Sequence, residues 1–261
     1  MKNKNYLHIV MFLIAFIISR RLGLPVAAVF IIAYAVIINY PNILFSRGAK
    51  MYAANNMAAA NKNFEKAYKF FYTEAKLKIS YSFYLLLQGE LQRAETIIKE
   101  IGSKPISDAD KLNLQINDSI LRWKKNDLNA AIEILEKLEK NTMVFQNLGF
   151  FKLLTGDYEG ALVYNLEAYD YNASNPGIMD NLAQNYFYLG NYEKAKELYT
   201  EILSKNPRFS TPYYYYASIL VDENSISEAI EVLERALKCN FSYISYIKKD
   251  VIEEKIEKLK L

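Results

Sequence analysis

Side chains that commonly carry out chemistry are scarce in this sequence of 261 residues. The one histidine, His8, lies inside an apolar N-terminal run, so the polar remainder has no imidazole for general-base or metal chemistry. The one cysteine, Cys239, has no partner in the chain for a disulfide or a thiolate metal site. No Gly-rich phosphate loop and no nucleophile with a histidine base is present. We therefore expect no catalytic residue, no metal site and no cofactor, and a protein that is not an enzyme.

A strong net charge is also missing. The 32 basic and 29 acidic residues leave a formal net charge of +3, which is too balanced to attract nucleic acid over a long range. The hydrophobic share of 52% argues against a disordered chain. Charged residues are rare in residues 1–45 and frequent afterwards. The sequence therefore predicts a membrane anchor over residues 1–45, with the lipid bilayer as its partner, followed by a soluble body.

Two apolar runs make up the predicted anchor, with Arg20 and Arg21 between them. As helices, residues 22–40 would span about 28 Å, close to the roughly 30 Å hydrocarbon core of a bilayer, whereas the first run would span about 20 Å. Flanking basic side chains can extend to the two interfaces and let the shorter run reach across. We predict a helical hairpin with spans at residues 6–19 and 22–40.

Three topologies remain open for the anchor. In a hairpin, Lys2 and Lys4 lie on the same side as Arg47 and Lys50, so the positive-inside rule places the body in the cytoplasm. A single span at residues 22–40 would place the body outside the cytoplasm. A cleaved signal peptide fits less well, because the apolar stretch is long and is interrupted by two arginines. The abundance of Lys, Asn, Ile and Tyr is typical of a bacterial chain from an AT-rich genome, which makes the plasma membrane the expected location.

The soluble body contains a sequence repeat. Residues 156–161, 190–195 and 224–229 align without gaps, and their terminal alanines are 34 residues apart, the period of a repeat made of two antiparallel helices and their turns. Gly156 and Gly190 are suited to end a first helix in a left-handed conformation. One repeat cannot bury its own apolar face, so stacking of about three or more repeats is needed for stability.

Weaker copies of the motif precede these three, at residues 62–67, 89–94 and 126–131, with irregular spacing. We assign degenerate repeats to residues 48–141 and confident repeats to residues 142–240. Residues 242–261 have the apolar periodicity of one amphipathic helix. We expect residues 241–261 to cap the exposed end of the array, the alternative being a helix that binds a partner or dimerises.

From about Gly48 onward, and most specifically over residues 142–240, the chain resembles the tetratricopeptide repeat (TPR) family. The resemblance implies an all-α, right-handed superhelix of paired helices, here preceded by one or two transmembrane helices. It also implies a scaffold that holds a partner peptide or helix in a groove lined by the first helix of each pair. Members that clamp a carboxylate use cations at inner positions, where this chain has Asp180, Gln184 and Tyr214. By the family's pattern, the groove-facing residues are Gln146, Asn147, Phe150, Asp180, Gln184, Phe187, Tyr214, Tyr215 and Ser218.

Two functions follow as hypotheses. The first is a membrane-anchored scaffold whose groove binds a protein partner, with Tyr214 and Tyr215 as candidate aromatic anchors. The second is a structural membrane subunit that self-associates through its hairpin into a homo-oligomer and uses the repeat array as a spacer. Small residues such as Ala27 and Ala33 would permit close helix approach in that case, although the anchor has no GxxxG pattern.

Overall fold

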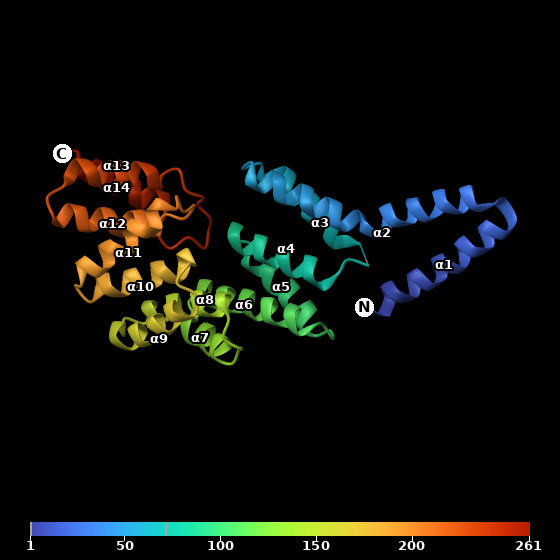
Figure 1. Ribbon diagram of the computed structural model, residues 1–261, viewed down its shortest axis with the longest axis horizontal. Helices are drawn as coiled ribbons and strands as arrows, with labels where there is room; N and C mark the ends of the chain where they lie inside the picture. The colour runs from blue at the N-terminus through green and yellow to red at the C-terminus, as the bar shows by residue number, and fades with distance from the viewer. Residues whose placement is uncertain (1, 71) are drawn as a thin grey trace. The chain divides into compact units, whose positions relative to one another are not determined.

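The computed structural model describes the backbone of residues 2–70 and 72–261, and the side chains of residues 6, 8–70 and 72–261. In this part of the chain there are fourteen helices and no strand (Figure 1), which confirms the predicted all-α class. The chain divides into two compact units. The N-terminal unit comprises Met1–Tyr84 and Ile97–Asp110, and the C-terminal unit comprises Leu85–Thr96 and Lys111–Leu261.

The helices follow one another with short connections. The N-terminal unit contains α1 (Lys2–Leu22), α2 (Leu24–Ala53), α3 (Met57–Lys69), most of α4 (Ala75–Gln88) and half of α5 (Leu91–Gly102). The C-terminal unit contains most of α6 (Asp108–Lys124) and then α7 (Leu128–Glu136), α8 (Thr142–Leu154), α9 (Tyr158–Tyr171), α10 (Pro176–Tyr188), α11 (Tyr192–Ser204), α12 (Thr211–Asp222), α13 (Ile226–Ala236) and α14 (Lys249–Leu259).

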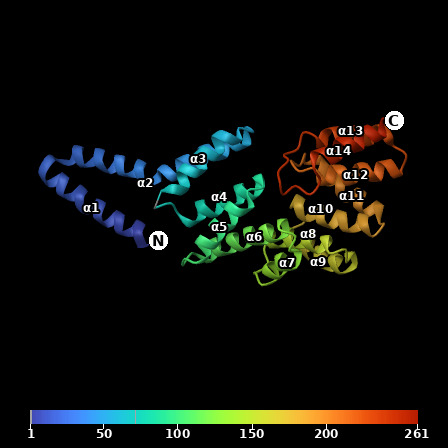
Figure 2. The ribbon, with the colours of Figure 1, turned by 180° about the vertical axis from the view of Figure 1, so that it is seen from behind.

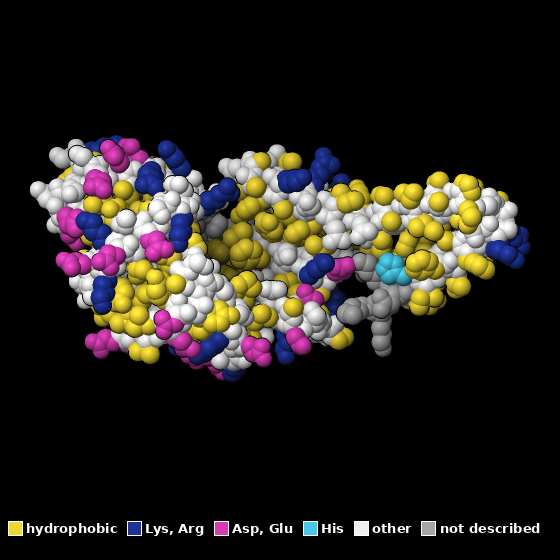
Figure 3. All heavy atoms as spheres, in the orientation of Figure 1, with side chains coloured by type: hydrophobic (Ala, Val, Ile, Leu, Met, Phe, Trp, Pro, Cys, Tyr) yellow, Lys and Arg dark blue, Asp and Glu magenta, His cyan; other side chains and the backbone are white. Residues whose placement is uncertain are grey.

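Helices α1 and α2 pack against each other as a hairpin. The turn lies at Gly23 rather than at the two arginines, because its φ of 90° is a conformation that only glycine adopts at little cost. Further along the hairpin, the Tyr34 hydroxyl lies 2.7 Å from Nδ1 of His8, which joins the two helices. Figure 3 shows apolar side chains over most of the visible hairpin surface and basic side chains at its turn. The side chains of Lys2 and Lys4, used above to orient the hairpin, lie outside the described part.

Helix α2 continues well past the apolar run, through Pro41 to Ala53. Proline has no backbone N–H, so the carbonyl of Ile37, four residues earlier, loses its helical partner. The hydroxyl of Tyr72 donates to this carbonyl at 2.9 Å and supplies the missing hydrogen bond. The helix therefore crosses the predicted end of the anchor at residue 45 without a break.

Aromatic packing holds the remainder of the N-terminal unit together. Gly48 of α2 lies so close to α3 that an added Cβ would be 2.7 Å from the Phe64 ring. That ring is fully buried and stacks on Tyr84 at 4.4 Å between centroids. Residues 62–67, expected to contain a turn, lie inside α3, and the turn is at Asn55, whose φ is 59°.

The C-terminal unit is a succession of helix pairs, α8 with α9, α10 with α11, and α12 with α13, which lie side by side in Figures 1 and 2. The turns within these pairs contain Gly156, Gly190 and Asn224, each with positive φ. Positive φ recurs at Gly89 and Asn126, at two of the three degenerate copies of the motif. Irregular spacing along the chain therefore coexists with the same local turn conformation.

The C-terminal helix is shorter than expected. It begins at Lys249, whereas residues 242–248 are not helical. The hydroxyl of Ser245 accepts from the Ser242 amide at 3.0 Å, and Nζ of Lys248 donates to the carbonyls of Ser242 and Tyr243 at 3.1 and 2.6 Å. These bonds satisfy backbone groups locally and replace helical bonds. The remaining helix, α14, packs against α13.

Candidate partner-binding groove

The nine residues expected to line a groove lie on α8, α10 and α12, the first helices of three successive pairs. Asp180, Gln184 and Tyr215 are 5%, 1% and 5% exposed, so they belong to the interior of the C-terminal unit. Gln146 is exposed. The other five are partly exposed: Asn147, Phe150, Phe187, Tyr214 and Ser218. The exposed and partly exposed residues are the members of the predicted set that a partner could reach.

Asp180 occupies an unusual position for an acidic residue. Nε2 of Gln184 donates to its Oδ2 at 2.9 Å, whereas its Oδ1 has no hydrogen-bond partner. Burial raises the pKa of this carboxyl well above its usual range, and the bond from Gln184 opposes that shift only in part. Ionisation of Asp180 is therefore disfavoured in the folded protein, and its buried carboxyl is out of reach of a partner.

Tyrosine residues fill the neighbouring interior. The hydroxyls of Tyr188 and Tyr215 are hydrogen-bonded to each other, and the Tyr215 ring packs against Phe187 at 5.0 Å between centroids. Burial, followed by the bond to Tyr188, raises the pKa of Tyr215. Tyr215 is therefore a packing residue in this structure, whereas Tyr214 keeps part of its ring exposed.

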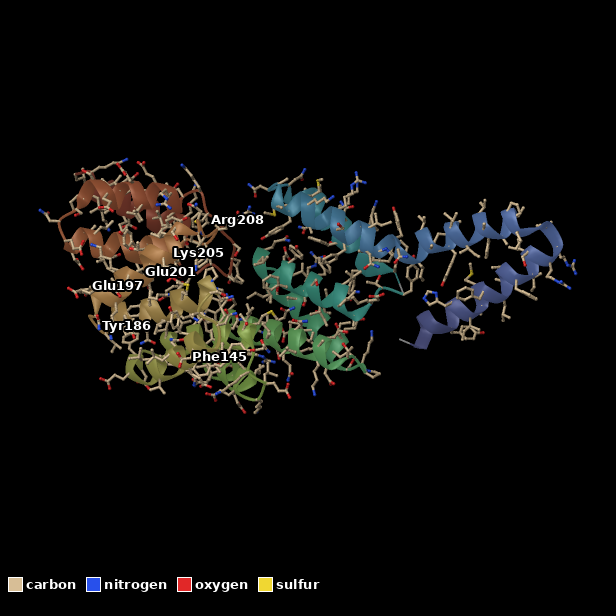
Figure 4. All side chains as sticks on the ribbon, viewed as in Figure 1. Phe145, Tyr186, Glu197, Glu201, Lys205 and Arg208 are labelled. Atoms are coloured by element: carbon tan, nitrogen blue, oxygen red, sulfur yellow. The ribbon has the colours of Figure 1, made fainter. Side chains whose placement is uncertain are left out.

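Residues 240–248 of the chain itself lie against the first helices. The segment begins where the Asn240 amide donates to the carbonyl of Arg208 at 2.9 Å. Figure 4 labels Arg208. The Tyr243 amide donates to the carbonyl of Leu87 at 2.8 Å, and the ring lies over Gly89, where an added Cβ would be 2.9 Å away. Backbone and side-chain contacts therefore hold the segment near the end of α4.

Further contacts continue along the segment. The Tyr246 ring meets Phe150 of α8 edge-on at 5.3 Å between centroids, and its hydroxyl interacts with Tyr188 of α10. The Ser210 hydroxyl donates to the carbonyl of Ile247 at 2.9 Å. We use the term inner face for the surface that meets this segment; its residues are Leu87, Lys124, Phe150, Tyr188 and Ser210.

Helix α14 continues the coverage onto α12. Nζ of Lys255 donates to the Ser218 hydroxyl at 2.6 Å and lies 4.5 Å from the centroid of the Tyr214 ring. Phe150, Tyr214 and Ser218 of the predicted set are thus brought together by contacts from the C-terminal residues of the same chain. The repeat pattern contains no signal for this arrangement, because residues 240–261 lie outside it.

The inner face is electropositive near Tyr243. Nζ of Lys124 lies 3.7 Å from the Trp123 ring centroid and 5.5 Å from that of Tyr243, and Nζ of Lys248 lies 5.4 Å from the same tyrosine ring. Burial, and then repulsion from Lys248, lowers the pKa of Lys124 to about 8. Among the described side chains no carboxylate lies within ion-pair distance of either lysine, although Asp250 opposes the lowering at Lys248. Two lysine side chains therefore share one aromatic site, and neither forms an ion pair there with a described carboxylate.

Helix α11, the second helix of its pair, carries exposed charged side chains. Glu197, Glu201 and Lys205 follow one another along α11 (Figure 4), and all three are exposed. Nζ of Lys205 is 2.9 Å from the Glu201 carboxylate, an exposed pair four residues apart that contributes little to stability. Within the described residues, no cluster of His, Cys, Asp and Glu is suited to hold a metal ion.

Comparison with known proteins identifies the repeat. The profile of the family described as "Tetratricopeptide repeat" matches residues 181–240. The TPR repeat-containing protein MJ1428 of Methanocaldococcus jannaschii is 30% identical over 92 residues, which are 34% of this chain and only 16% of that protein.

Solved structures share the fold. The crystal structure of the APC/C hetero-tetramer Cut9-Hcn1 superposes with a TM-score of 0.60 at 15% identity, covering 95% of this chain and 45% of the matched chain. A tetratricopeptide repeat protein from Parabacteroides merdae matches with a TM-score of 0.48 at 12% identity, covering 85% of this chain and 99% of that one. The first likeness shows the helical-repeat fold and no more.

Proposed function

Since the chain carries tetratricopeptide repeats in an all-helical repeat fold, we propose that it is a membrane-anchored scaffold that binds a segment of a protein partner. It works by binding and carries out no reaction. The observation that carries the membrane part is the exposed apolar surface of the α1–α2 hairpin. The binding part rests on the partly exposed aromatic and polar side chains along the first helices.

The hairpin surface is poorly suited to water. Phe12, Val29 and Leu24 are 69%, 68% and 77% exposed, and burying a large apolar side chain of this kind is favourable by about 1.5–3 kcal/mol. Among the described residues, α2 is the one helix that is long and apolar enough to cross a bilayer. Its 30 residues span about 45 Å, so the part beyond Pro41 would extend out of a hydrocarbon core of roughly 30 Å.

The hairpin topology is preferred over a single span. In the hairpin, the exposed Arg20 and Arg21 would lie at the interface beside the Gly23 turn, and both ends would lie on the opposite side. The anchor then comprises residues 1–45, and the repeat array over residues 48–240 faces the cytoplasm from the plasma membrane. In a single-span arrangement the array would face outward.

The anchor is tested by placing charge on the exposed surface of α2. The variant carrying Val29→Lys and Ile32→Lys should lose membrane retention, because each lysine near the centre of a span costs about 2.5–3.5 kcal/mol. The matched control carries Val29→Leu and Ile32→Leu. Alkaline extraction of membranes should release the lysine variant and leave the control in the pellet. Equal retention of both proteins would contradict the anchor.

The side of the membrane is tested in the same cells. In the hairpin topology, a protease should cut the repeat array only after the membrane is opened. Cleavage in intact cells would contradict the hairpin topology and indicate a single span. The self-association alternative is tested by the size of the detergent-solubilised chain, since a structural subunit would form an oligomer that the two lysine substitutions in α2 disrupt.

A further inference from the structure

The inner face holds an extended segment of its own chain in the manner of a bound peptide. Contacts to residues 240–248 come from residues of α4, α6, α8 and α10 and from the residue before α12, which are Leu87, Lys124, Phe150, Tyr188 and Ser210. One contact is a backbone hydrogen bond that any peptide can make, and another is an edge-on contact between two aromatic rings. This combination is typical of surfaces that bind extended peptides.

The middle of the segment lies on the inner face outside the buried core, whereas Ile247 belongs to the main buried cluster and Phe241 packs against it. Tyr243 and Tyr246 are 44% and 39% exposed, and neither belongs to the buried clusters of the unit. The rings of Tyr246 and Phe150 are in edge-on contact. A contact of this kind typically changes a binding constant by about two- to tenfold. Release of residues 242–246 would therefore leave Ile247 and the helix pairs packed.

Charge shows that the segment is a poor match for this surface. Lys248 brings a second cation to the aromatic site that Lys124 already occupies. Burial lowers the pKa of each lysine; repulsion from Lys248 adds to the lowering at Lys124, whereas Asp250 opposes the lowering at Lys248. The segment remains bound because its attachment to α13 gives it an effective concentration of mM order. A ligand with a carboxylate in place of Lys248 would pair with Lys124 and remove the repulsion.

We propose that the inner face is a binding site for an extended segment of another protein that carries two aromatic side chains and an acidic residue, and that residues 242–246 occupy this site until that partner displaces them. The proposal rests on the scaffold function above and names the chemistry of its partner. Tyr243 and Tyr246 mark the positions of the two aromatic side chains. Lys124 is the specificity-determining residue for the acidic one.

The test uses the full chain in detergent micelles and two fluorescent peptides. One peptide has the sequence of residues 240–250, NFSYISYIKKD, and the other carries Lys248→Glu and Lys249→Glu. Anisotropy measures their binding to the unchanged protein, to the Tyr246→Ala variant and to the matched Tyr246→Phe control. The alanine variant loses the ring contact that holds the segment, whereas the phenylalanine variant keeps it.

We expect Tyr246→Ala to bind both peptides about two- to tenfold more tightly than the unchanged protein, and Tyr246→Phe to bind like it. The acidic peptide should bind roughly two- to fivefold more tightly than the other, and Lys124→Gln should remove that preference. Amide hydrogen exchange at Tyr243 provides the second measurement. Exchange should accelerate in Tyr246→Ala, and in the unchanged protein when peptide is added.

Three other results would each contradict one part of the proposal. Equal binding to Tyr246→Ala and the unchanged protein, with unaltered exchange at Tyr243, would refute displacement and leave the scaffold function standing. A preference for the unaltered peptide would refute the acidic partner and indicate a second copy of this chain as the occupant. If neither peptide binds any of the proteins, the inner face is not a peptide site, and the groove part of the scaffold function fails with it.

Discussion

Replacing Asp180 with asparagine tests most directly whether burial raises the pKa of this carboxyl. Its carboxyl is 5% exposed, has one hydrogen bond from Gln184, and leaves Oδ1 without a partner. The nearby Tyr199 hydroxyl is also buried without a partner, and Asp180 contributes to raising its pKa. Asparagine has almost the same shape and keeps an oxygen for Gln184, but it never ionises. The substitution therefore removes a charge without creating a cavity.

The pH dependence follows from linkage. Burial raises the pKa of Asp180 in the folded protein. In the unfolded chain the same carboxyl has its ordinary pKa of about 3.9, so it loses its proton at a lower pH than in the folded protein. Below that pH both states hold the proton, and Asp180 costs no stability. As the pH rises towards the folded-state pKa, the free energy of unfolding falls by about 1.4 kcal/mol per pH unit. Asp180→Asn should therefore stabilise the protein increasingly as the pH rises from about 4 towards the folded-state pKa.

Urea unfolding of the two proteins in detergent, followed by circular dichroism, measures this difference at several pH values. The matched control is Asp170→Asn, because Asp170 is exposed near the end of α9. The control should change the free energy of unfolding by less than about 0.5 kcal/mol at every pH. A pH-independent difference between Asp180→Asn and the unchanged protein would show that Asp180 is ionised in the folded state, and would refute the reasoning.

Two further predictions concern packing. Gly149→Ala should destabilise the protein by roughly 1–2 kcal/mol, because its Cβ would lie 2.2 Å from Oδ1 of the buried Asn165 and the overpacking outweighs the gain in helix propensity. In Gly177→Ala the added Cβ meets the exposed side chain of Gln146, which can move aside, so this substitution should be nearly neutral. Fluorescence of the single tryptophan during unfolding compares the two variants, and equal losses of stability would contradict the steric argument. Tyr72→Phe should lower the free energy of unfolding by about 0.5–1.5 kcal/mol, since it leaves the Ile37 carbonyl unpaired, and an unchanged thermal midpoint in detergent would show that water replaces the hydroxyl.

Some features of the fold were predictable because they depend on local sequence. Gly156 and Gly190 end helices at positive φ, as expected, since glycine adopts that conformation without a steric penalty. Asp157 caps α9 through its bond from the Gly160 amide at 2.9 Å. The 34-residue spacing of the alanines indicated helix pairs because close helix packing repeats with the same period.

Other predictions failed where local patterns compete. The apolar periodicity of residues 242–261 suggested one helix, yet serine side chains and Lys248 satisfy the backbone of residues 242–248 in a turn. A local pattern was also misleading at residues 62–67, which match the repeat motif but lie inside α3. Residues that match the motif indicate a turn only if a residue suited to positive φ precedes them closely. In this part of the chain the residue with positive φ is Asn55, in the turn before α3.

The sequence by itself determined the helix pairs, their turns and the apolar hairpin, because side-chain periodicity and backbone sterics act over a few residues. Only the tertiary structure decided which inner residues are accessible. Asp180 and Tyr215 are enclosed by neighbouring helices, and Phe150 meets Tyr246 from far along the chain. Contacts of that kind depend on how the helix pairs stack in three dimensions, and a one-dimensional repeat does not record which segment comes to lie on the surface it creates.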